Sequence, residues 1–306
     1  MSTLPLWINW LIEPFTYSFM QRGLLAAVMV SVICAVLGAF VVLRGMAFVG
    51  DAMAHTILPG IVIAYWLGGN LLLGALAAGL LTAFGIGWFT RDGQLQEDTA
   101  IGVMFSGLFA LGILLLSIVS SYRDLTHILF GNILGVSGTD LWLIAGVGVL
   151  VVGMVLAFFK ELVVTSFDPG HAITIGLSPG VVRYGLLILL AFATVSGIQS
   201  VGVVMVVSLL VTPAATAYLL SQQLPRMILM SVGFSVGAAL VGLYLSYYWN
   251  LASGATIVLA LTTLFIIVFL IAPRRGLLWR MRAKHTSTGG TDERNETGRE
   301  DLLLSE

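Results

Sequence analysis

Long apolar runs dominate this 306-residue sequence and limit what it can fold into. A helix needs about 20 residues to cross a hydrocarbon core about 30 Å thick. Eight runs are clear and a ninth is possible. Only Ile198, Gln199 and Ser200 separate the sixth run from the seventh, so one of these two could enter the membrane without crossing it. The runs are 23–43, 49–67, 71–89, 100–119, 141–159, 181–197, 201–220, 227–249 and 256–272. They are twice too long for barrel strands and lack strict alternation, so we expect an all-α bundle of eight to nine transmembrane helices.

Charged residues are sparse in these runs and gather at the carboxyl end. They make up 9% of the chain, against about a quarter in a soluble protein. Of 14 Lys and Arg and 15 Asp and Glu, thirteen lie in residues 274–306. This distribution excludes a soluble enzyme, and the net charge of -1 gives no reason to expect nucleic acid binding. We therefore divide the chain into a transmembrane domain, 1–273, and a basic juxtamembrane segment with a disordered tail, 274–306.

Lysine and arginine in short connections indicate orientation, because their excess lies on the cytoplasmic side. If nine runs alternate across the membrane, one side carries Arg44, Arg91, Lys160, Arg183, Arg226 and the basic cluster of 274–284. Only Arg22 and Arg123 fall on the other side. The carboxyl terminus is therefore expected in the cytoplasm.

Two ionisable side chains, Asp51 and His55, lie within the second run. A charge near the middle of a membrane helix costs about 2.5 to 3.5 kcal/mol on insertion scales, so each needs a partner or a task. Residues four apart share one helix face, where a carboxylate and an imidazole can bind one divalent ion such as Mn²⁺ or Zn²⁺. Two ligands are too few, and a second copy across a symmetry axis would bring them to four. A metal site here predicts a homodimer around a central path.

The same pair has a purely structural interpretation. Asp51 could cap the second helix, since Asp is a good N-cap residue, and His55 could bond to a neighbouring helix. Spacing alone leaves both interpretations open. Pro59 and Gly60 further predict that this helix is bent or interrupted midway, which would expose backbone where a path could run.

Other polar residues are assigned to helix ends and breaks. Three acids lie where spans begin and are expected at helix N-termini, where acids are favourable: Glu97, Asp98 and Asp140. The pair Thr212 and Pro213 predicts a kink or a half-helix in the seventh run. His127, in a polar-flanked stretch, could help a metal to enter or could simply be solvated.

Between the fifth and sixth runs, residues 160–180 form a cytoplasmic segment with its own helix signal. Asp168 is a good N-cap, Pro169 suits the first helical position, and Gly176 or the pair Ser178 and Pro179 would end the helix. This helix of about two turns carries Ala172, Ile173, Ile175 and Leu177. It is too short to be stable alone in water, so it should rest on its own bundle or on a separate soluble subunit.

Four motifs, in the same order along the chain, resemble the manganese/zinc ABC-transporter permeases. They are GDAMAHTILPG at 50–60, LFGNILGVS at 129–137, FDPGHAITIGLSP at 167–179 and VGVVMVVSLLVTPAATA at 201–217. The likeness extends over about residues 15–273, and the tail after Lys284 has no counterpart in it.

The resemblance implies the membrane-spanning subunit of an ATP-driven importer in the bacterial plasma membrane, with Mn²⁺ as cargo or Zn²⁺ as the alternative. It implies a second copy of the chain, two ATP-binding cassette subunits that use the ATP, and an extracytoplasmic metal-binding protein, with no permanently bound cofactor. In that family an aspartate and a histidine one helical turn apart bind the metal, and here they are Asp51 and His55. The family's coupling helix corresponds to 168–177. Its candidate contacts with the ATPase are Asp168, Pro169, Ala172, Ile173, Gly176 and Leu177.

Two rival functions follow from the residues. An ATP-independent metal channel or a proton-coupled carrier could use the same pair, and the absence of a G-x-x-x-x-G-K-[ST] loop fits all of these transporters. An intramembrane serine protease would use Ser137 of Gly-Val-Ser-Gly with a histidine from another span, but the later histidines, His171 and His285, fall in cytoplasmic segments. No H-E-x-x-H zinc-protease motif occurs either, so we do not expect an enzyme.

Overall fold

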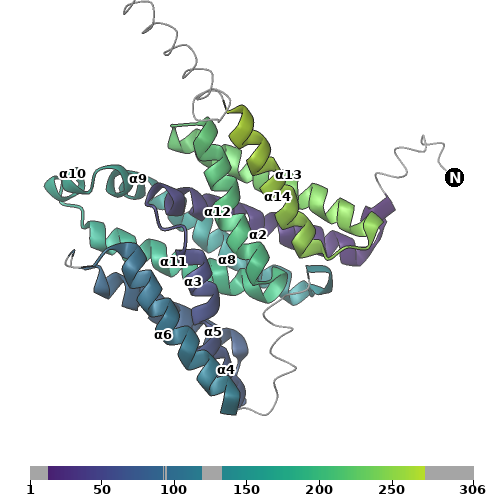
Figure 1. The fold of residues 1–306 in the computed structure, drawn as a ribbon, viewed down its shortest axis with the longest axis horizontal. Helices are drawn as coiled ribbons and strands as arrows, with labels where there is room; N and C mark the ends of the chain where they lie inside the picture. Colours follow the sequence, from purple (N-terminus) through teal and green to yellow (C-terminus); the bar gives the residue numbers. More distant parts are fainter. Residues whose placement is uncertain (1–12, 92, 94, 119–132, 273–306) are drawn as a thin grey trace, which may run out of the picture.

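The computed structural model describes residues 13–91, 93, 95–118 and 133–272, which fold into helices joined by short connections (Figure 1). No β-strand occurs in that part of the chain. Eight of its helices are long and apolar enough to cross a membrane. They are α2 (Ser18–Leu43), α5 (Leu71–Phe89), α6 (Glu97–Ile118), α8 (Gly138–Ala157), α11 (Pro179–Val201), α12 (Val203–Leu220), α13 (Leu224–Trp249) and α14 (Ser253–Ile271). The predicted all-α membrane bundle is confirmed.

The second predicted span consists of two shorter helices. Helix α3 (Val49–Thr56) ends before Ile57, and α4 (Leu58–Trp66) begins directly after it with Pro59 in its first turn. A proline cannot donate its backbone nitrogen to the preceding turn, so it is tolerated at the start of a helix and not in its middle. The predicted interruption near Pro59 is confirmed, and this broken span adds to the eight long helices.

The sixth and seventh runs are both long helices, separated at Gly202. The φ angle of Gly202 is 89°, which favours glycine over other residues. The half-helix predicted at Thr212 and Pro213 is wrong, because Pro213 lies inside the uninterrupted α12. Neighbouring helices and hydroxyl side chains make proline tolerable within membrane helices.

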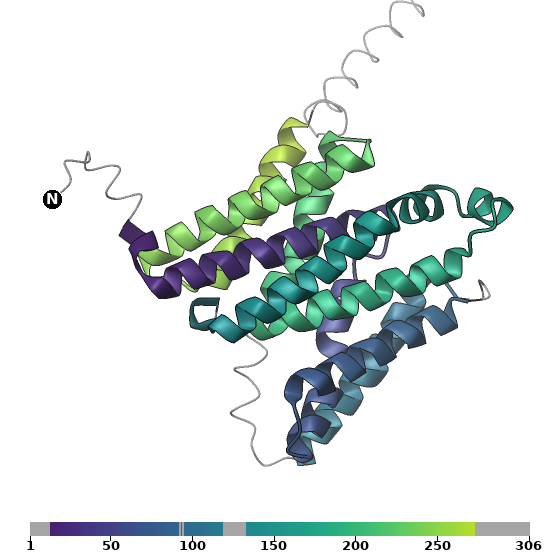
Figure 2. The ribbon, with the colours of Figure 1, turned by 180° about the vertical axis from the view of Figure 1, so that it is seen from behind.

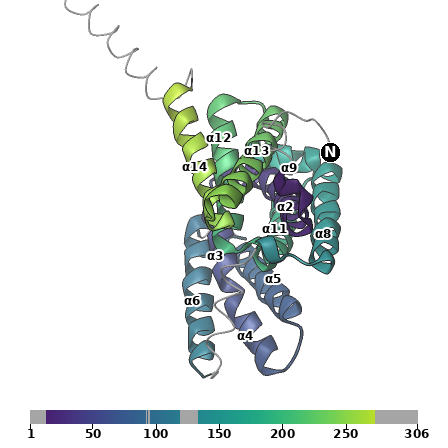
Figure 3. The same cartoon turned by 90° about the vertical axis from the view of Figure 1, so that its right-hand side faces the viewer.

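Helix α2 forms the centre of the bundle. It packs against α8, α11, α12 and α13, and Figure 2 shows it between α8 and α13. Most of its residues are buried. Close crossings depend on small residues, since a Cβ added at Gly38 would collide with the carbonyl oxygen of Leu210 in α12. Helices α4, α5 and α6 lie together on one side of this centre (Figure 3) and contact it through α3 and α11.

Two short helices, α9 (Phe159–Phe167) and α10 (Pro169–Thr174), lie at one end of the bundle, opposite the amino terminus (Figure 1). Five basic residues lie in the connections on this side or in the helix turns next to them, and we call it the basic end: Arg44, Arg91, Lys160, Arg183 and Arg226. The short 3₁₀ helices η1 (Glu13–Thr16) and η2 (Ile133–Gly135) complete the described structure. The predicted tail of 274–306 and His127 lie outside the described residues.

Candidate metal site

The two predicted metal ligands lie on the short helix α3. Phe48 is the N-cap residue and makes no side-chain capping bond, so Asp51, the third residue of the helix, does not cap it. The side chain of Asp51 is 47% exposed and that of His55 is 32% exposed. The residues between them, 52–54, are buried. The spacing of four therefore places both ionisable groups on one face of α3, which the described part of the chain covers only partly.

The two groups lie within reach of a single ion. Nε2 of His55 is 3.5 Å from Oδ1 of Asp51. Ligand atoms bound to one metal at about 2.0–2.2 Å lie about 3 to 3.5 Å from one another, so this spacing suits a shared cation. The ring centroid of His55 lies 5.8 Å from that of Phe105 and 5.2 Å from that of Phe109, both in α6. The neighbouring helix thus contacts His55 through aromatic packing.

Helix α3 is held in place on two other sides. The hydroxyl oxygens of Thr56 in α3 and Thr82 in α5 lie 2.8 Å apart in a buried position. On another side, a Cβ added at Gly50 would lie 2.5 Å from Cδ2 of Leu210 in α12. These contacts hold the helix by its other faces, while Asp51 and His55 stay partly exposed and His55 packs against α6.

The number of ligands in one chain is too small for a complete site. In the part of the chain that the structure describes, no group of three or more His, Cys, Asp and Glu side chains gathers in one place. A divalent ion held by Asp51 and His55 would therefore take its remaining ligands from a second copy, from water or from outside the described ranges.

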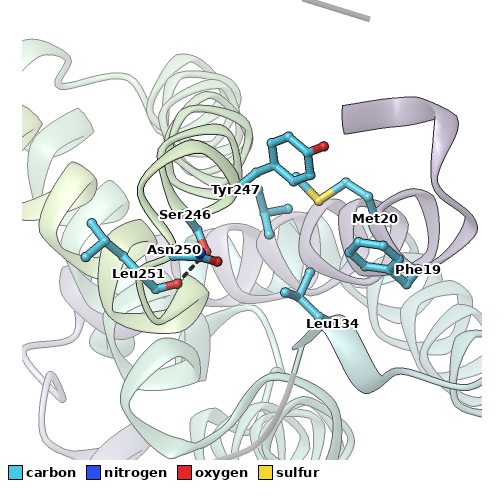
Figure 4. A pocket seen from close by; sticks show the side chains of 8 residues that line it. Phe19, Met20, Leu134, Ser246, Tyr247, Asn250 and Leu251 are labelled. Atoms are coloured by element: carbon cyan, nitrogen blue, oxygen red, sulfur yellow. Dashed lines mark hydrogen bonds between the residues drawn. The ribbon is translucent and has the colours of Figure 1, made fainter. Parts of the chain in front are cut away.

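A separate cavity of about 250 Å³ lies between the start of α2 and the end of α13 (Figure 4). Its lining comes from α2, η2, α13 and the residues after α13: Phe19, Met20, Leu134, Leu243, Ser246, Tyr247, Asn250 and Leu251. None of these is an acid, a histidine or a cysteine. The hydroxyl of Ser246 donates to the carbonyl oxygen of Leu251 at 2.7 Å. This cavity therefore lacks the ligands that bind transition metals.

The predicted helix at 168–177 is confirmed as α10. The side chain of Asp168 accepts a bond from the backbone nitrogen of His171 at 2.9 Å, with Pro169 at the first helical position. The helix ends in paired bonds from Leu177 to Ala172 and from Gly176 to Ile173, at 2.9 and 3.0 Å. Gly176 has a φ of 82°, as this ending requires.

The candidate partner contacts on α10 differ in exposure. Ala172 is fully buried against the chain's own bundle, so it anchors the helix. Ile173 is 64% exposed, and Ile175 and the preceding Phe167 are also exposed. Four further candidates are exposed or half-buried: Asp168, Pro169, Gly176 and Leu177. The short helix thus rests on its own bundle by one face and presents apolar side chains on another.

The three acids predicted at helix N-termini are all there. Glu97 and Asp98 open α6. Asp140 lies in the first turn of α8, where it accepts from the backbone nitrogen of Ser137 at 2.9 Å. The hydroxyl oxygen of Ser137 in turn accepts from the backbone nitrogen of Asp140, which completes a capping box. The serine of the Gly-Val-Ser-Gly motif therefore has a structural part in starting α8.

Sequence reasoning did not identify the aromatic neighbours of His55 or the partners of the basic end. Phe105 and Phe109 belong to a uniformly apolar run, in which nothing marks one face. Nη1 of Arg183 in α11 lies 3.3 Å from Oε1 of Glu97 in α6, although the two residues are far apart in the sequence. Arg44 donates to Ser166. Only the fold brings these residues together.

Comparison with known proteins places this arrangement in a family. Residues 16–272 match the ABC 3 transport family. The chain is 46% identical over 263 residues to the manganese transport system membrane protein MntC of Listeria monocytogenes, covering 86% of this chain and 94% of that protein. It is 41% identical over 259 residues to a protein of Haemophilus influenzae described as a probable iron transport system membrane protein, covering 85% and 96%.

A solved structure has the same fold. The structure of PsaBC from Streptococcus pneumoniae in complex with Fab contains a chain 39% identical to this one, with a TM-score of 0.77, covering 88% of this chain and 98% of that one. The sequence match spans every described long helix and includes the helix that carries Asp51 and His55. The protein therefore belongs to the ABC 3 transport family and is a multi-pass membrane protein of that family.

Proposed function

We propose that this chain is the membrane-spanning subunit of an ATP-driven importer of divalent transition metal ions. The observation that carries the proposal is the pair Asp51 and His55, 3.5 Å apart on the partly exposed face of a helix that is otherwise buried. A carboxylate facing lipid is costly, so the pair needs a partner or a cargo ion. Membership of a transport family supports the cargo.

The cargo we assign first is Mn²⁺, with Zn²⁺ as the alternative. A carboxylate oxygen and an imidazole nitrogen suit Mn²⁺, Fe²⁺ and Zn²⁺ alike, and intrinsic affinity would favour zinc over manganese. Relatives named for manganese and for iron support a cargo of this class. Selection among these ions would then depend on site geometry and on the ion delivered to the site.

The second copy of the chain would complete the site. Its Asp51 and His55, related by a two-fold axis, would raise the number of protein ligands to four. The exposure of both side chains in the single chain supports this arrangement, because a partner surface over α3 would cover them. The homodimer is thus part of the proposal.

Two ATP-binding cassette subunits would bind at α10. The exposed Ile173 and Ile175, with Asp168, Pro169, Gly176 and Leu177 around them, offer the contact, and Ala172 anchors the helix to the bundle. This assignment puts the basic end and the carboxyl terminus in the cytoplasm of a bacterial cell, in agreement with the excess of Lys and Arg there. An extracytoplasmic metal-binding protein would deliver the ion at the opposite end.

Purification and uptake together test the proposal. The tagged full-length chain, isolated from its own cells, is expected to carry a stoichiometric ATPase chain. Cells lacking other importers and expressing both chains should take up radioactive Mn²⁺ only while the ATPase is active. Uptake that continues at the same rate with an inactive ATPase would favour the channel or carrier and overturn the proposal.

A further inference from the structure

Two arginine side chains at the basic end make contacts that involve the helices before and after α10 in the chain, α9 and α11. The first, Arg44, follows directly after α2 and donates to α9, the helix before α10. Its Nη2 lies 2.9 Å from Oγ1 of Thr165, and its Nε lies 3.0 Å from Oγ of Ser166. Both hydroxyls donate to carbonyl oxygens of their own helix, at Glu161 and Leu162, so they present lone pairs to the guanidinium.

The second arginine, Arg183, lies near the start of α11, the helix after α10. Its Nη1 lies 3.3 Å from Oε1 of Glu97, the first residue of α6, and its Nη2 donates to the carbonyl oxygen of Gly87 in α5 at 3.5 Å. The side chains of Arg183 and Glu97 are only 15% and 31% exposed. This contact connects α11 with α5 and α6.

Each contact continues toward the metal site through a short and ordered path. Beyond Arg44, the chain turns at Gly45, whose φ is 74°, and reaches Met46 and Val49, which are buried. The backbone nitrogen of Val49 donates to the carbonyl oxygen of Met46 at 3.0 Å as α3 begins. Asp51 follows in the first turn of that helix. A hydrogen-bonded turn of four residues therefore connects Arg44 to α3.

The path from Glu97 runs along α6. About two helical turns lead from Glu97 to Phe105, and one more leads to Phe109. Both rings contact His55. One continuous helix therefore carries both the partner of Arg183 and the rings that pack against His55.

The two contacts form one electrostatic cluster. Burial lowers the pKa of the Arg44 guanidinium, Glu97 raises it and Arg183 lowers it, in that order of size. Arg44 thus interacts electrostatically with both Arg183 and Glu97. Breaking either contact would leave a half-buried charge without its partner.

We propose that Arg44 and Arg183 are positioning residues that couple movement of α10 to the metal site, Arg44 through α3 to Asp51 and Arg183 through Glu97 and α6 to His55. The inference rests on the proposed function. The observation beneath it is that Arg44 binds α9 to the turn before α3, which carries both candidate ligands, and that Arg183 binds α11 to α6, whose Phe105 and Phe109 pack against His55.

The quantity that tests this role is the number of Mn²⁺ ions carried per ATP hydrolysed. It is measured on the full complex with its ATPase, reconstituted in proteoliposomes. Loss of hydrogen bonds to a charged group corresponds to about a tenfold change in an equilibrium, so Arg44→Gln and Arg183→Gln should each lower the ratio about tenfold while ATP hydrolysis continues. Arg44→Lys should recover part of it, because an ammonium can still donate to the two hydroxyls.

Three further variants separate this role from general damage. Arg91→Gln, at an exposed arginine of the same end, should keep the parental ratio. Thr165→Val with Ser166→Ala removes the acceptors and should act like Arg44→Gln, which keeps the test open if that variant does not fold. Glu97→Gln combined with Arg183→Gln should be no worse than either alone, since both break the same contact.

The outcomes distinguish the inference from the function beneath it. If the parental complex carries no Mn²⁺, or carries it without ATP, the proposed function fails. If the parental complex works and Arg44→Gln keeps the parental ratio, the coupling role fails alone. If uptake and ATP hydrolysis fall in equal proportion in that variant, Arg44 merely supports the fold and the inference is overturned.

Discussion

Gly60 of α4 and Gly74 of α5 cross with their backbones in contact. A Cβ added to either one would collide with the carbonyl oxygen of the other. Close backbone packing of this kind stabilises membrane helices, where apolar side chains gain nothing by leaving lipid. The crossing holds α4 against α5. It therefore also helps to fix the position of α3, the helix directly before α4.

Gly74→Ala is therefore expected to lower the thermal stability of the purified protein. The added methyl must displace backbone rather than a flexible side chain, and such overpacking costs about 1 to 3 kcal/mol. Gly153→Ala in α8 is the matched control, because a Cβ there meets nothing within 4 Å. It should be neutral or raise stability by up to about 1 kcal/mol. Equal melting temperatures for the two variants in detergent would contradict the crossing.

The buried hydroxyl pair Thr56 and Thr82 predicts a non-additive effect. Thr82→Val should destabilise the protein by about 1 kcal/mol, since it removes the partner on the α5 side. Thr56→Val together with Thr82→Val should cost less than the sum of the single changes, because each single change already removes the bond that the two hydroxyls share. Thermal unfolding of the two single variants and the double variant gives the interaction free energy of the pair, as in a double-mutant cycle. Strict additivity would show that the two hydroxyls do not interact.

Local chemistry made part of this fold predictable from sequence. Helix α10 was marked at both ends by residues that act within one turn, Asp168 with Pro169 at its start and Gly176 after its end. The interruption of the second span followed from Pro59 for the same reason. Proline alone is a weaker signal, however. Pro213 lies within a continuous helix, as prolines in membrane helices can.

Contacts between distant parts of the chain could not be predicted in this way. Asp51 and His55 were found because four residues of spacing fix their relation within one helix. The rings of Phe105 and Phe109 were not, because their run is apolar on every side. The contact of Arg183 with Glu97 depends on how α6 and α11 pack, which the periodicity of neither helix specifies.

The exposed face of α10 predicts how the ATPase binds. Ile173→Ser should reduce the amount of ATPase chain that co-purifies with this protein, since it removes an apolar side chain that is 64% exposed. Leu95→Ser, at an exposed apolar residue in the α5–α6 connection, is the matched control and should retain it. Quantitative gel analysis of the purified complex gives the ratio. An unchanged ratio for Ile173→Ser would place the contact elsewhere.

Removal of either candidate ligand should abolish transport without unfolding the protein. Asp51→Ala and His55→Ala are expected to lower Mn²⁺ uptake by at least about tenfold at equal expression, because loss of one metal ligand removes a bond that no water replaces with equal strength. Asp98→Ala, which removes an exposed acid from the first turn of another helix, should leave uptake near the parental rate. Parental uptake by either site variant would remove Asp51 and His55 from the transport path.

The most direct measurement is the location of Mn²⁺ itself. Anomalous X-ray diffraction from the purified complex, collected at the manganese edge after soaking in Mn²⁺, should show a peak between Nε2 of His55 and the carboxylate of Asp51. That peak should vanish in Asp51→Ala crystals. A manganese peak elsewhere in the membrane domain, with Asp51 and His55 in contact only with each other, would contradict the account.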